Sequence, residues 1–321
     1  MSFAQRSVII VTPVYEDVEA SSQLFKELAA QLNNDVFVVA VDDGSVKQPL
    51  GIEGFDKAGI DGVVLKLRRN VGHQRAIAIG LGYVSEHIQA EQRVVVMDCD
   101  GEDMPATILD LLAHLEPDDI DVAVAQRKSR VETLWFKLFY AVYKRLFSLM
   151  TGRQISFGNF MALKPHAVKR LVTMQELSIH VAGAVLASKL RTDICSLDRG
   201  PRYAGQSKMN FVGLALHGFK GLMVFAEDVL VRVGIACALI ATLSVLGTIA
   251  AVILKLIGFS TPGWFSVALG ILILMFLQTG ALVLMTLMLT GVVRSGTVTT
   301  AISYHDFIDK IIEAPNQVNN R

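Results

Sequence analysis

Four acidic residues lie together directly after a short apolar run. They are Asp98, Asp100, Glu102 and Asp103. Carboxylates this close repel one another strongly unless a cation or a basic side chain lies beside them. A divalent ion held by carboxylate and diphosphate oxygens is one solution, and such an ion would stabilise a departing nucleoside diphosphate. The segment therefore predicts a site for Mg²⁺ or Mn²⁺, with an acidic cap on the following helix as the alternative.

Three other polar clusters also follow runs of apolar, β-branched residues. They are Thr12-Pro13-Val14-Tyr15-Glu16, Asp42-Asp43-Gly44-Ser45 and Arg69-Asn70-Val71-Gly72. The apolar runs predict strands at 7–14, 36–41, 63–67, 93–97 and 122–125. Helical spacing of apolar residues predicts helices at 16–32, 73–87 and 105–115.

Strands that alternate with helices predict an α/β fold, with a mostly parallel sheet and helices on both of its faces. In such sheets, ligands bind beyond the carboxyl ends of the strands. Every polar cluster described above follows a predicted strand, so we expect the clusters to meet at one edge of the sheet. A nucleotide is the ligand that this arrangement favours.

The order and spacing of these four clusters resemble glycosyltransferase family 2, over about residues 7–210. Within the family, they are most similar to the dolichyl- or polyprenyl-phosphate sugar synthase branch. The resemblance implies a GT-A-type fold, a UDP- or GDP-sugar donor and a Mg²⁺ or Mn²⁺ cofactor. A Gln-x-x-Arg-Trp motif, typical of processive polysaccharide synthases in the family, does not occur, which disfavours repeated chain extension.

The resemblance also implies roles for single residues. The nucleoside would be held or framed by Pro13, Tyr15, Glu16, Asp42, Asp43, Asn70 and Gly72. Asp98 would approach the ribose or the metal, Asp100 would bind the metal, and Glu102 could be a further ligand. Glutamine is usual in the branch where this chain has Glu102, so the chain departs here from the pattern of the best-known mannose and glucose synthases.

The stretch from residue 127 to residue 153 is basic and rich in aromatic residues. It holds seven basic residues and one acidic residue. Such a helix, expected at 133–150, is suited to an anionic membrane interface. Arg127 and Arg130 could receive a lipid phosphate, because guanidinium groups match phosphate oxygens. An amphipathic core helix is an alternative, and nucleic-acid binding is disfavoured by the apolar segments that follow.

A second basic segment follows at residues 202–208. It resembles the family's Arg-x-x-Gly-x-Ser-Lys sequence through Arg202, Gly205, Ser207 and Lys208. Such a loop could close over the diphosphate and neutralise its charge during transfer. A plain basic linker before a membrane segment is the alternative.

A general base is needed only if the acceptor is a hydroxyl group, because a phosphate oxygen is already anionic. Glu176 and His180 are four residues apart, a spacing that would put them on one helical face. They are the candidates, with two ordinary surface residues as the alternative.

Two long uncharged segments, 233–254 and 264–293, follow the α/β region. The first spans roughly 33 Å as a helix, enough to cross a bilayer. A pair of buried core helices is the alternative. Basic residues flank the pair, which predicts a hairpin with both of its ends in the cytosol. The three cysteines are far apart, which fits a reducing compartment.

These features predict a cytosolic catalytic domain at 1–228, a transmembrane hairpin at 229–294 and a cytosolic tail at 295–321. A second amphipathic stretch, 211–228, approaches the membrane. The first functional hypothesis is inverting transfer of a single sugar to a polyprenyl phosphate at the cytosolic membrane face. Transfer to a lipid hydroxyl and a non-catalytic membrane scaffold are the alternatives. The oligomeric state stays open, a homo-oligomer included.

Overall fold

The structure is a computed structural model that describes residues 3–127, 134–204, 211–259, 261, 263–296 and 303–314. The chain forms two compact units. The first contains residues 1–140, 155–224 and 301–321, and the second contains residues 141–154 and 225–300.

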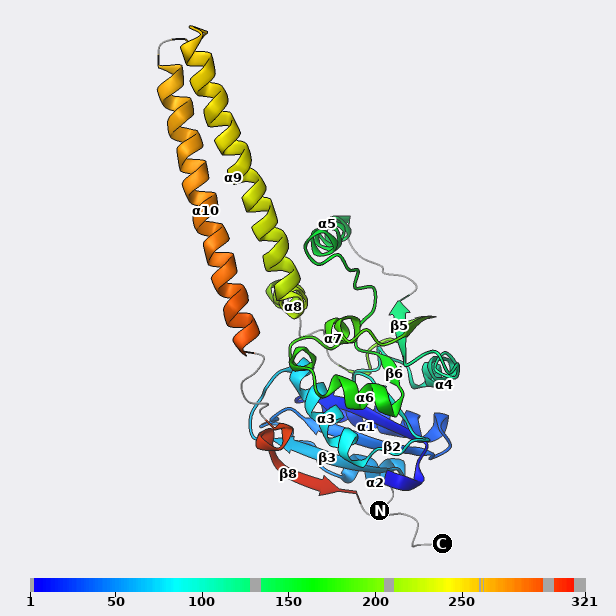
Figure 1. The fold of residues 1–321 in the computed structure, drawn as a ribbon. Helices are drawn as coiled ribbons and strands as arrows, with labels where there is room; N and C mark the ends of the chain where they lie inside the picture. Colours follow the sequence, from blue (N-terminus) through cyan, green and yellow to red (C-terminus); the bar gives the residue numbers. More distant parts are fainter. Residues whose placement is uncertain are drawn as a thin grey trace. The chain divides into compact units, whose positions relative to one another are not determined.

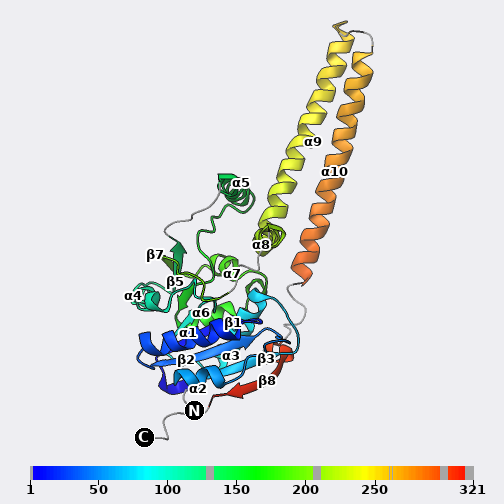
Figure 2. The same cartoon turned by 180° about the vertical axis from the view of Figure 1, so that it is seen from behind.

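The first unit is built around an eight-stranded sheet with the order β7-β5-β6-β4-β1-β2-β3-β8 (Figures 1 and 2). The strands are β1 (Val8–Val14), β2 (Val36–Asp42), β3 (Asp61–Leu67), β4 (Arg93–Val96), β5 (Val122–Arg127), β6 (Met161–Leu163), β7 (Thr192–Leu197) and β8 (Ile308–Glu313). Parallel pairing joins β4, β1, β2 and β3, and also β5 and β7. The strand β6 runs antiparallel to both β4 and β5, so the carboxyl ends of β1 to β5 and β7 point to the same edge of the sheet.

Helices cover both faces of this sheet. The helices and 3₁₀ turns of the unit are η1 (Phe3–Gln5), α1 (Val18–Gln31), α2 (Glu53–Ala58), α3 (His73–His87), η2 (Pro105–Thr107), α4 (Ile108–Ala113), α6 (Pro165–Leu171), η3 (Gln175–Ser178), α7 (Val181–Ala187), α8 (Phe211–Val224) and η4 (Tyr304–Phe307). Ile9 and Val11 of β1 pack with Ile77 of α3, whereas Ile10 packs with Phe25 of α1. Alternate residues of one buried strand thus build two separate cores, as a sheet covered on both faces requires.

The predicted α/β fold is confirmed, and α3 begins and ends where the sequence pattern places it. One predicted element differs. The helix expected at 105–115 begins as the 3₁₀ turn η2 and continues as the short α4. Pro105 lacks the N–H group that a regular first turn would leave unpaired, which suits it to this start.

The segment after the two long helices returns to the sheet as its edge strand, β8. It pairs antiparallel with β3, with Leu65 opposite Ile311. The preceding turn, η4, packs on α3, where the ring of Tyr304 covers Gly82. The sequence predicts only a tail here, and the structure makes part of that tail a member of the α/β unit.

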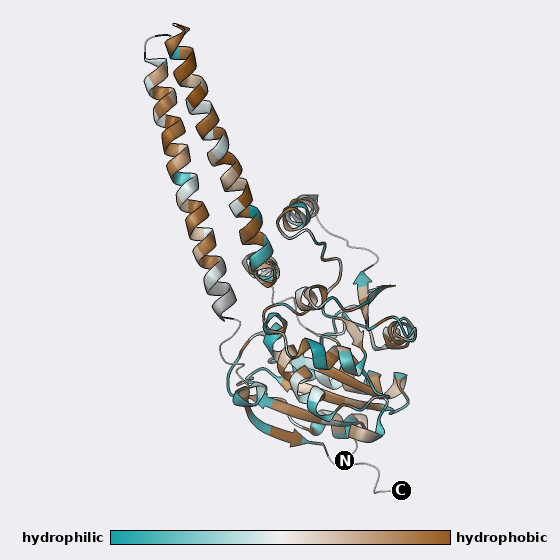
Figure 3. Ribbon diagram, viewed as in Figure 1, coloured by the Kyte–Doolittle hydropathy of each residue, from teal (hydrophilic) through white to brown (hydrophobic). Residues whose placement is uncertain are grey.

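The second unit contains a pair of long helices, α9 (Ala226–Leu256) and α10 (Trp264–Gly296). Both are long and apolar enough to cross a membrane. Figure 3 shows the greater part of both helices in hydrophobic colours, with hydrophilic turns near the start of α9. Large apolar side chains such as Leu239, Leu246 and Leu274 are exposed along them. Core helices would bury these side chains, so their exposure favours membrane-spanning helices over the core-helix alternative.

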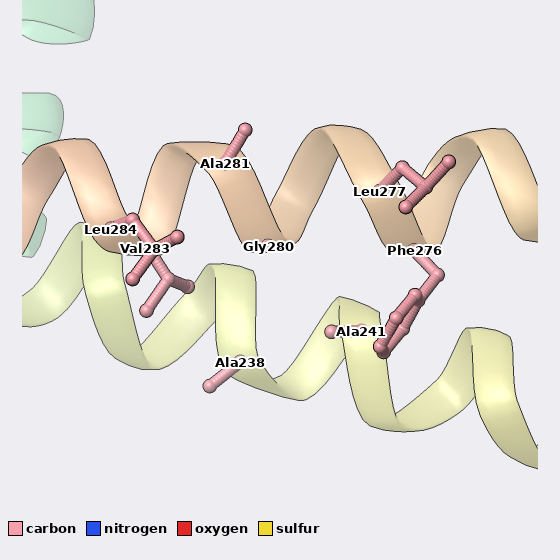
Figure 4. A pocket seen from close by; sticks show the side chains of 8 residues that line it. All are labelled: Ala238, Ala241, Phe276, Leu277, Gly280, Ala281, Val283 and Leu284. Carbon is pink, nitrogen blue, oxygen red and sulfur yellow. The ribbon is translucent and has the colours of Figure 1, made fainter.

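The two long helices pack through small residues. Cys237, Ser244 and Ala251 of α9 are buried, as are Thr279 and Thr286 of α10. The seven-residue spacing of these positions is typical of helices that supercoil around each other. An apolar groove of about 640 Å³ runs along the pair. In Figure 4, its residue Phe276 points from α10 toward Ala241 of α9, while Leu277 and Ala281 point away.

The helix α5 (Leu134–Thr151) continues into the second unit. Its Phe147 is buried against Phe225, with ring centroids 6.0 Å apart. By contrast, Val142, Leu146 and Leu149 are exposed. Apolar side chains therefore lie on the exposed side of α5 as well as at its buried Phe147. Its placement at a membrane interface stays a prediction.

Candidate active site

A pocket of about 150 Å³ lies at the carboxyl ends of the central strands. It is lined by Pro13, Val14, Tyr15, Asp43, Asn70, Gly72 and His73. Five of these residues are ones that the family resemblance assigns to the nucleoside. The pocket joins the ends of β1 and β2 to the start of α3, because these strands are adjacent and parallel.

Asp43 lines this pocket and also binds the backbone of Val71 and Gly72 on the other side of it. The carboxylate accepts the backbone N–H groups of Val71 at 2.7 Å and Gly72 at 3.0 Å. Burial raises the pKa of Asp43, against the opposing effect of these two hydrogen bonds. Gly44 makes the close approach possible, since a β-carbon there would lie 2.5 Å from the carbonyl carbon of Arg69.

Asp42 and Glu16 do not line the pocket. Asp42 is buried, and its two oxygens accept the backbone N–H groups of Ser45 and Leu50, both at 3.0 Å. Glu16 has a left-handed backbone, with φ of 49°. Its carboxylate accepts the backbone N–H groups of residues 46, 47 and 48 at 2.7 to 3.0 Å. Both side chains therefore fix the loop that follows β2.

The acidic residues after β4 form two pairs, Asp98 with Asp103 and Asp100 with Glu102, and the two pairs have different partners. In the first, His73 Nε2 lies 3.2 Å from Asp98 Oδ1. Burial alone would raise the pKa of Asp98, but the charges of His73 and Arg199 outweigh it and lower that pKa. Asp103 Oδ2 accepts the backbone N–H of Asp98 at 3.0 Å. Burial and the neighbouring Asp98 raise the pKa of Asp103 to about 7.

In the second pair, Asp100 and Glu102 face arginines. Arg202 Nη2 lies 2.8 Å from Asp100 Oδ2, and Arg202 Nε lies 3.3 Å from Glu102 Oε1. Arg199 forms an ion pair with the same Glu102. Burial, followed by the charge of Asp98, raises the pKa of Asp100. Basic side chains thus relieve the repulsion among these carboxylates in this structure.

The segment that carries the two arginines is bonded to the acidic loop by its backbone. Gly200 donates its N–H to the carbonyl of Glu102 at 3.0 Å, and Tyr203 donates its N–H to the carbonyl of Asp100 at 2.9 Å. The ring of Tyr203 lies against Gly101, whose φ of 89° only glycine adopts readily. Residues about 100 positions apart in the chain therefore form one compact structure at the sheet edge.

One observation bears on a divalent cation. Asp98 Oδ1 is buried, and it makes no hydrogen bond to any residue that the structure describes. It contacts His73 Nε2 at 3.2 Å, an interaction that also lowers the pKa of Asp98. Such an oxygen suits a hard cation. Over the described residues, however, no group of three or more acidic, histidine or cysteine side chains is arranged to hold a metal ion. Asp100 and Glu102 face arginines in this structure.

The residues predicted on the acceptor side are only partly described. Arg127 is the exposed last residue of β5, and its charge contributes to the lowered pKa of Asp98. Arg127 is therefore near the acidic cluster. Arg130, Ser207 and Lys208 lie outside the residues that the structure describes.

Glu176 and His180 do not share a helical face. Glu176 is in the turn η3, whereas His180 is the extended residue that caps α7, with φ of −158°. His180 Nδ1 accepts the backbone N–H of Gly183 at 3.0 Å, so Nε2 carries the proton and faces His217 Nε2 at 3.2 Å. Burial and then His217 lower the pKa of His180 to about 3. Both ring nitrogens are engaged, which makes His180 a structural cap rather than a base.

Two residues of the site were missed by the sequence analysis. His73 is the first residue of α3 and contacts Asp98. Its position directly after Gly72 in a polar cluster was the available signal. Arg199 contacts Glu102 and influences Asp98. It lies three residues before Arg202, but only the folded chain brings it to the acidic loop.

Comparison with known proteins agrees with this geometry. A family model described as glycosyl transferase family 2 matches residues 9–163. The chain is 26% identical over 275 residues to an uncharacterized glycosyltransferase of Synechocystis, covering 83% of this chain and 84% of the relative. It is 27% identical over 265 residues to the uncharacterized glycosyltransferase YkcC of Bacillus subtilis, covering 80% of each.

Two further proteins are more distantly similar. A prophage bactoprenol glucosyl transferase homolog of Escherichia coli is 23% identical over 246 residues, covering 73% of this chain and 78% of the relative. Glucosyl-3-phosphoglycerate synthase of Mycobacterium tuberculosis, solved with Mn²⁺, UDP and glucosyl-3-phosphoglycerate, gives a TM-score of 0.46 at 16% identity, covering 72% of this chain and 81% of that one. The chain is therefore a glycosyltransferase with a GT-A-type fold, and its residues 9–163 match glycosyl transferase family 2.

Proposed function

We propose that this glycosyltransferase moves a single sugar, with inversion, from a UDP- or GDP-sugar to a polyprenyl phosphate at the cytosolic membrane face. The observation that carries the proposal is the edge of the sheet where the pocket, the carboxylates and two arginines meet. A nucleoside diphosphate needs an apolar and polar pocket for its base and ribose, and cations for its phosphates. Here the pocket and the charged cluster lie at the same edge of the sheet, because His73 lines the pocket and also contacts Asp98.

The donor would bind with its nucleoside in the pocket of Pro13, Tyr15, Asp43, Asn70 and Gly72. Tyr15 is 44% exposed, which leaves its ring accessible for stacking. Asp98 and Asp100, with Glu102 beside them, would hold a Mg²⁺ or Mn²⁺ ion, which when bound neutralises charge on the departing diphosphate. Arg202 would neutralise the same charge from the protein side.

Two features support a lipid acceptor. The chain carries two helices that are long and apolar enough to cross a membrane, with exposed apolar side chains along them. A relative is named as a bactoprenol glucosyl transferase homolog, and bactoprenol is a polyprenol. A phosphate acceptor also needs no general base, which agrees with the engagement of both nitrogens of His180.

The orientation follows from β8. This strand belongs to the sheet of the α/β unit and comes after both long helices. If α9 and α10 cross the membrane, the chain must return to the side on which it began, so a two-span hairpin is the arrangement that we propose. Basic residues at the two ends of the hairpin, Arg232 and Arg294, favour the cytosol for that side.

The test is a transfer assay on the full chain in proteoliposomes. Radiolabelled UDP- and GDP-sugars are offered with undecaprenyl phosphate or with diacylglycerol, and the labelled lipid is extracted and treated with mild acid. We expect label only with undecaprenyl phosphate and its release by acid, since a glycosyl phosphate is acid-labile. An acid-stable product formed with diacylglycerol would instead establish transfer to a hydroxyl, and no labelled lipid with any donor would contradict the proposal.

A further inference from the structure

Arg202 occupies the carboxylates that the proposed function assigns to a divalent cation. Its Nη2 atom lies 2.8 Å from Asp100 Oδ2, and its Nε atom lies 3.3 Å from Glu102 Oε1. Arg199 pairs with Glu102 from the other side. All three pairs are partly shielded, because the side chains of Asp100 and Glu102 are only 14% and 17% exposed.

The same carboxylate oxygens cannot hold both a guanidinium group and a metal ion at full strength. A cation that binds Asp100 displaces Arg202 from Oδ2 or is repelled by it across a few ångströms, and repulsion is strong where water is partly excluded. The arginine and the metal ion therefore compete for Asp100. When a metal ion displaces an arginine from its carboxylate, the released guanidinium group can bind another anion.

In the proposed reaction, the diphosphate of the donor is such an anion. A nucleoside diphosphate presents several phosphate oxygens, and arginine binds phosphate in the same forked geometry as it binds carboxylate. The arginine segment is held in place by backbone bonds from Gly200 and Tyr203 to the acidic loop. The side chains of Arg199 and Arg202 can thus change partners while the backbone beneath them stays.

We infer that Arg199 and Arg202 form an exchangeable counter-charge, which the acidic loop holds until a divalent cation and the donor diphosphate arrive together. With such a cation held by Asp98 and Asp100, the side chains of Arg199 and Arg202 would be released to bind the diphosphate. Glu102, where the family branch usually has glutamine, serves mainly to hold the two arginines. The inference rests on the proposed function, because it takes the donor to be a nucleotide sugar.

The inference predicts opposite changes for two ligands. In Arg202→Gln, Mn²⁺ alone should bind about tenfold more tightly, a change equal to about 1.4 kcal/mol, because its competitor is gone. UDP or GDP, offered with saturating Mn²⁺, should bind about tenfold more weakly, again about 1.4 kcal/mol, because the diphosphate loses a guanidinium. Arg199→Gln should move both affinities in the same two directions. A variant that merely loosens the loop would weaken both ligands.

The measurements are Mn²⁺ binding by electron paramagnetic resonance and nucleotide binding by calorimetry, on the full chain in detergent. Arg202→Lys keeps a positive charge and should stay close to the wild type for Mn²⁺. Arg191→Gln is the matched control, because Arg191 pairs with Asp121 elsewhere in the unit, at 2.6 Å, and should change neither affinity. Thermal melting establishes that each variant is folded, and Arg199→Gln carries the test if Arg202→Gln is not.

The outcomes separate the two proposals. If the wild type binds Mn²⁺ and nucleotide and transfers sugar, but neither arginine variant binds Mn²⁺ more tightly, the exchange is refuted and the proposed function stands. If the wild type binds no divalent cation with or without nucleotide, the cation role fails and the exchange fails with it. Tighter Mn²⁺ together with weaker nucleotide, in folded protein, supports the exchange.

Discussion

Asp100, which follows β4, makes three polar contacts. Its Oδ1 atom accepts the backbone N–H of Glu102 at 3.0 Å, its Oδ2 atom pairs with Arg202, and its backbone carbonyl accepts the N–H of Tyr203. Only the pairing of Oδ2 depends on the negative charge. A change from aspartate to asparagine therefore separates the charge of this residue from its place in the loop.

We expect Asp100→Asn to lower turnover by about 10²–10³-fold, the loss typical of removing one group that stabilises transition-state charge. The fold should persist, since the asparagine oxygen can still accept the N–H of Glu102. Transfer rates in proteoliposomes and circular dichroism of the purified protein measure the two effects. Glu102→Gln, which introduces the residue usual in the family branch, should cost much less. Near-normal turnover of folded Asp100→Asn would contradict the charge role.

At the scale of single elements, the start of α7 depends on a neutral histidine. His180 caps the helix by accepting the N–H of Gly183, and its other nitrogen faces His217. Burial and His217 lower the pKa of His180 to about 3, whereas an unfolded histidine titrates near 6.5. Between these two values the unfolded chain binds the proton and the folded chain does not. Stability therefore falls as the pH drops below about 6.5.

The expected cost of this effect at pH 5 is up to about 2 kcal/mol. His180→Asn keeps a good helix cap and removes the titrating group, so its melting temperature should fall less than that of the wild type between pH 7 and pH 5. Thermal melting of both proteins across this range is the measurement. Equal slopes of melting temperature against pH would show that His180 does not titrate in this way.

The edge strand β8 is the other element with a testable consequence. It satisfies the backbone of β3 and buries Ile308. A chain that ends before β8 should expose this edge, lose about 3 kcal/mol or more of stability from unmade hydrogen bonds, and aggregate. A chain that ends after Ala314 retains β8 and is the control. Size-exclusion profiles and melting temperatures compare them, and equal behaviour of the two truncations would contradict a structural role for β8.

For the whole molecule, β8 and the two long helices together constrain topology. The three native cysteines are buried, so a new cysteine can be labelled selectively. With both ends of the hairpin on the cytosolic side, a membrane-impermeant maleimide applied to intact cells should label Thr261→Cys in the connector. It should label Asp309→Cys, an exposed residue of β8, only after the cells are opened. Labelling of both sites from the same side would refute the hairpin.

Local signals in the sequence were enough to predict the class of fold, which is confirmed, and the edge of the sheet at which the candidate residues gather. Runs of β-branched residues, helical periods between them and polar residues at the end of each run are local signals, and parallel strands necessarily bring their carboxyl ends together. Five of the residues assigned to the nucleoside, Pro13 and Asn70 among them, line one pocket for this reason. The two long apolar helices could also be predicted from the sequence alone, because length and lack of charge are local properties.

Which charged side chains meet could be seen only in the folded chain. Arg202 and Glu102 are 100 residues apart, and no periodicity or spacing predicts that pair or the neighbouring contact of Arg199. The side chain of His180, which caps α7, likewise meets a distant partner, His217 of α8. The return of β8 to β3 needed an unpaired sheet edge to receive it. Each of these is a long-range pairing, whose free energy exists only once the sheet has brought the partners together.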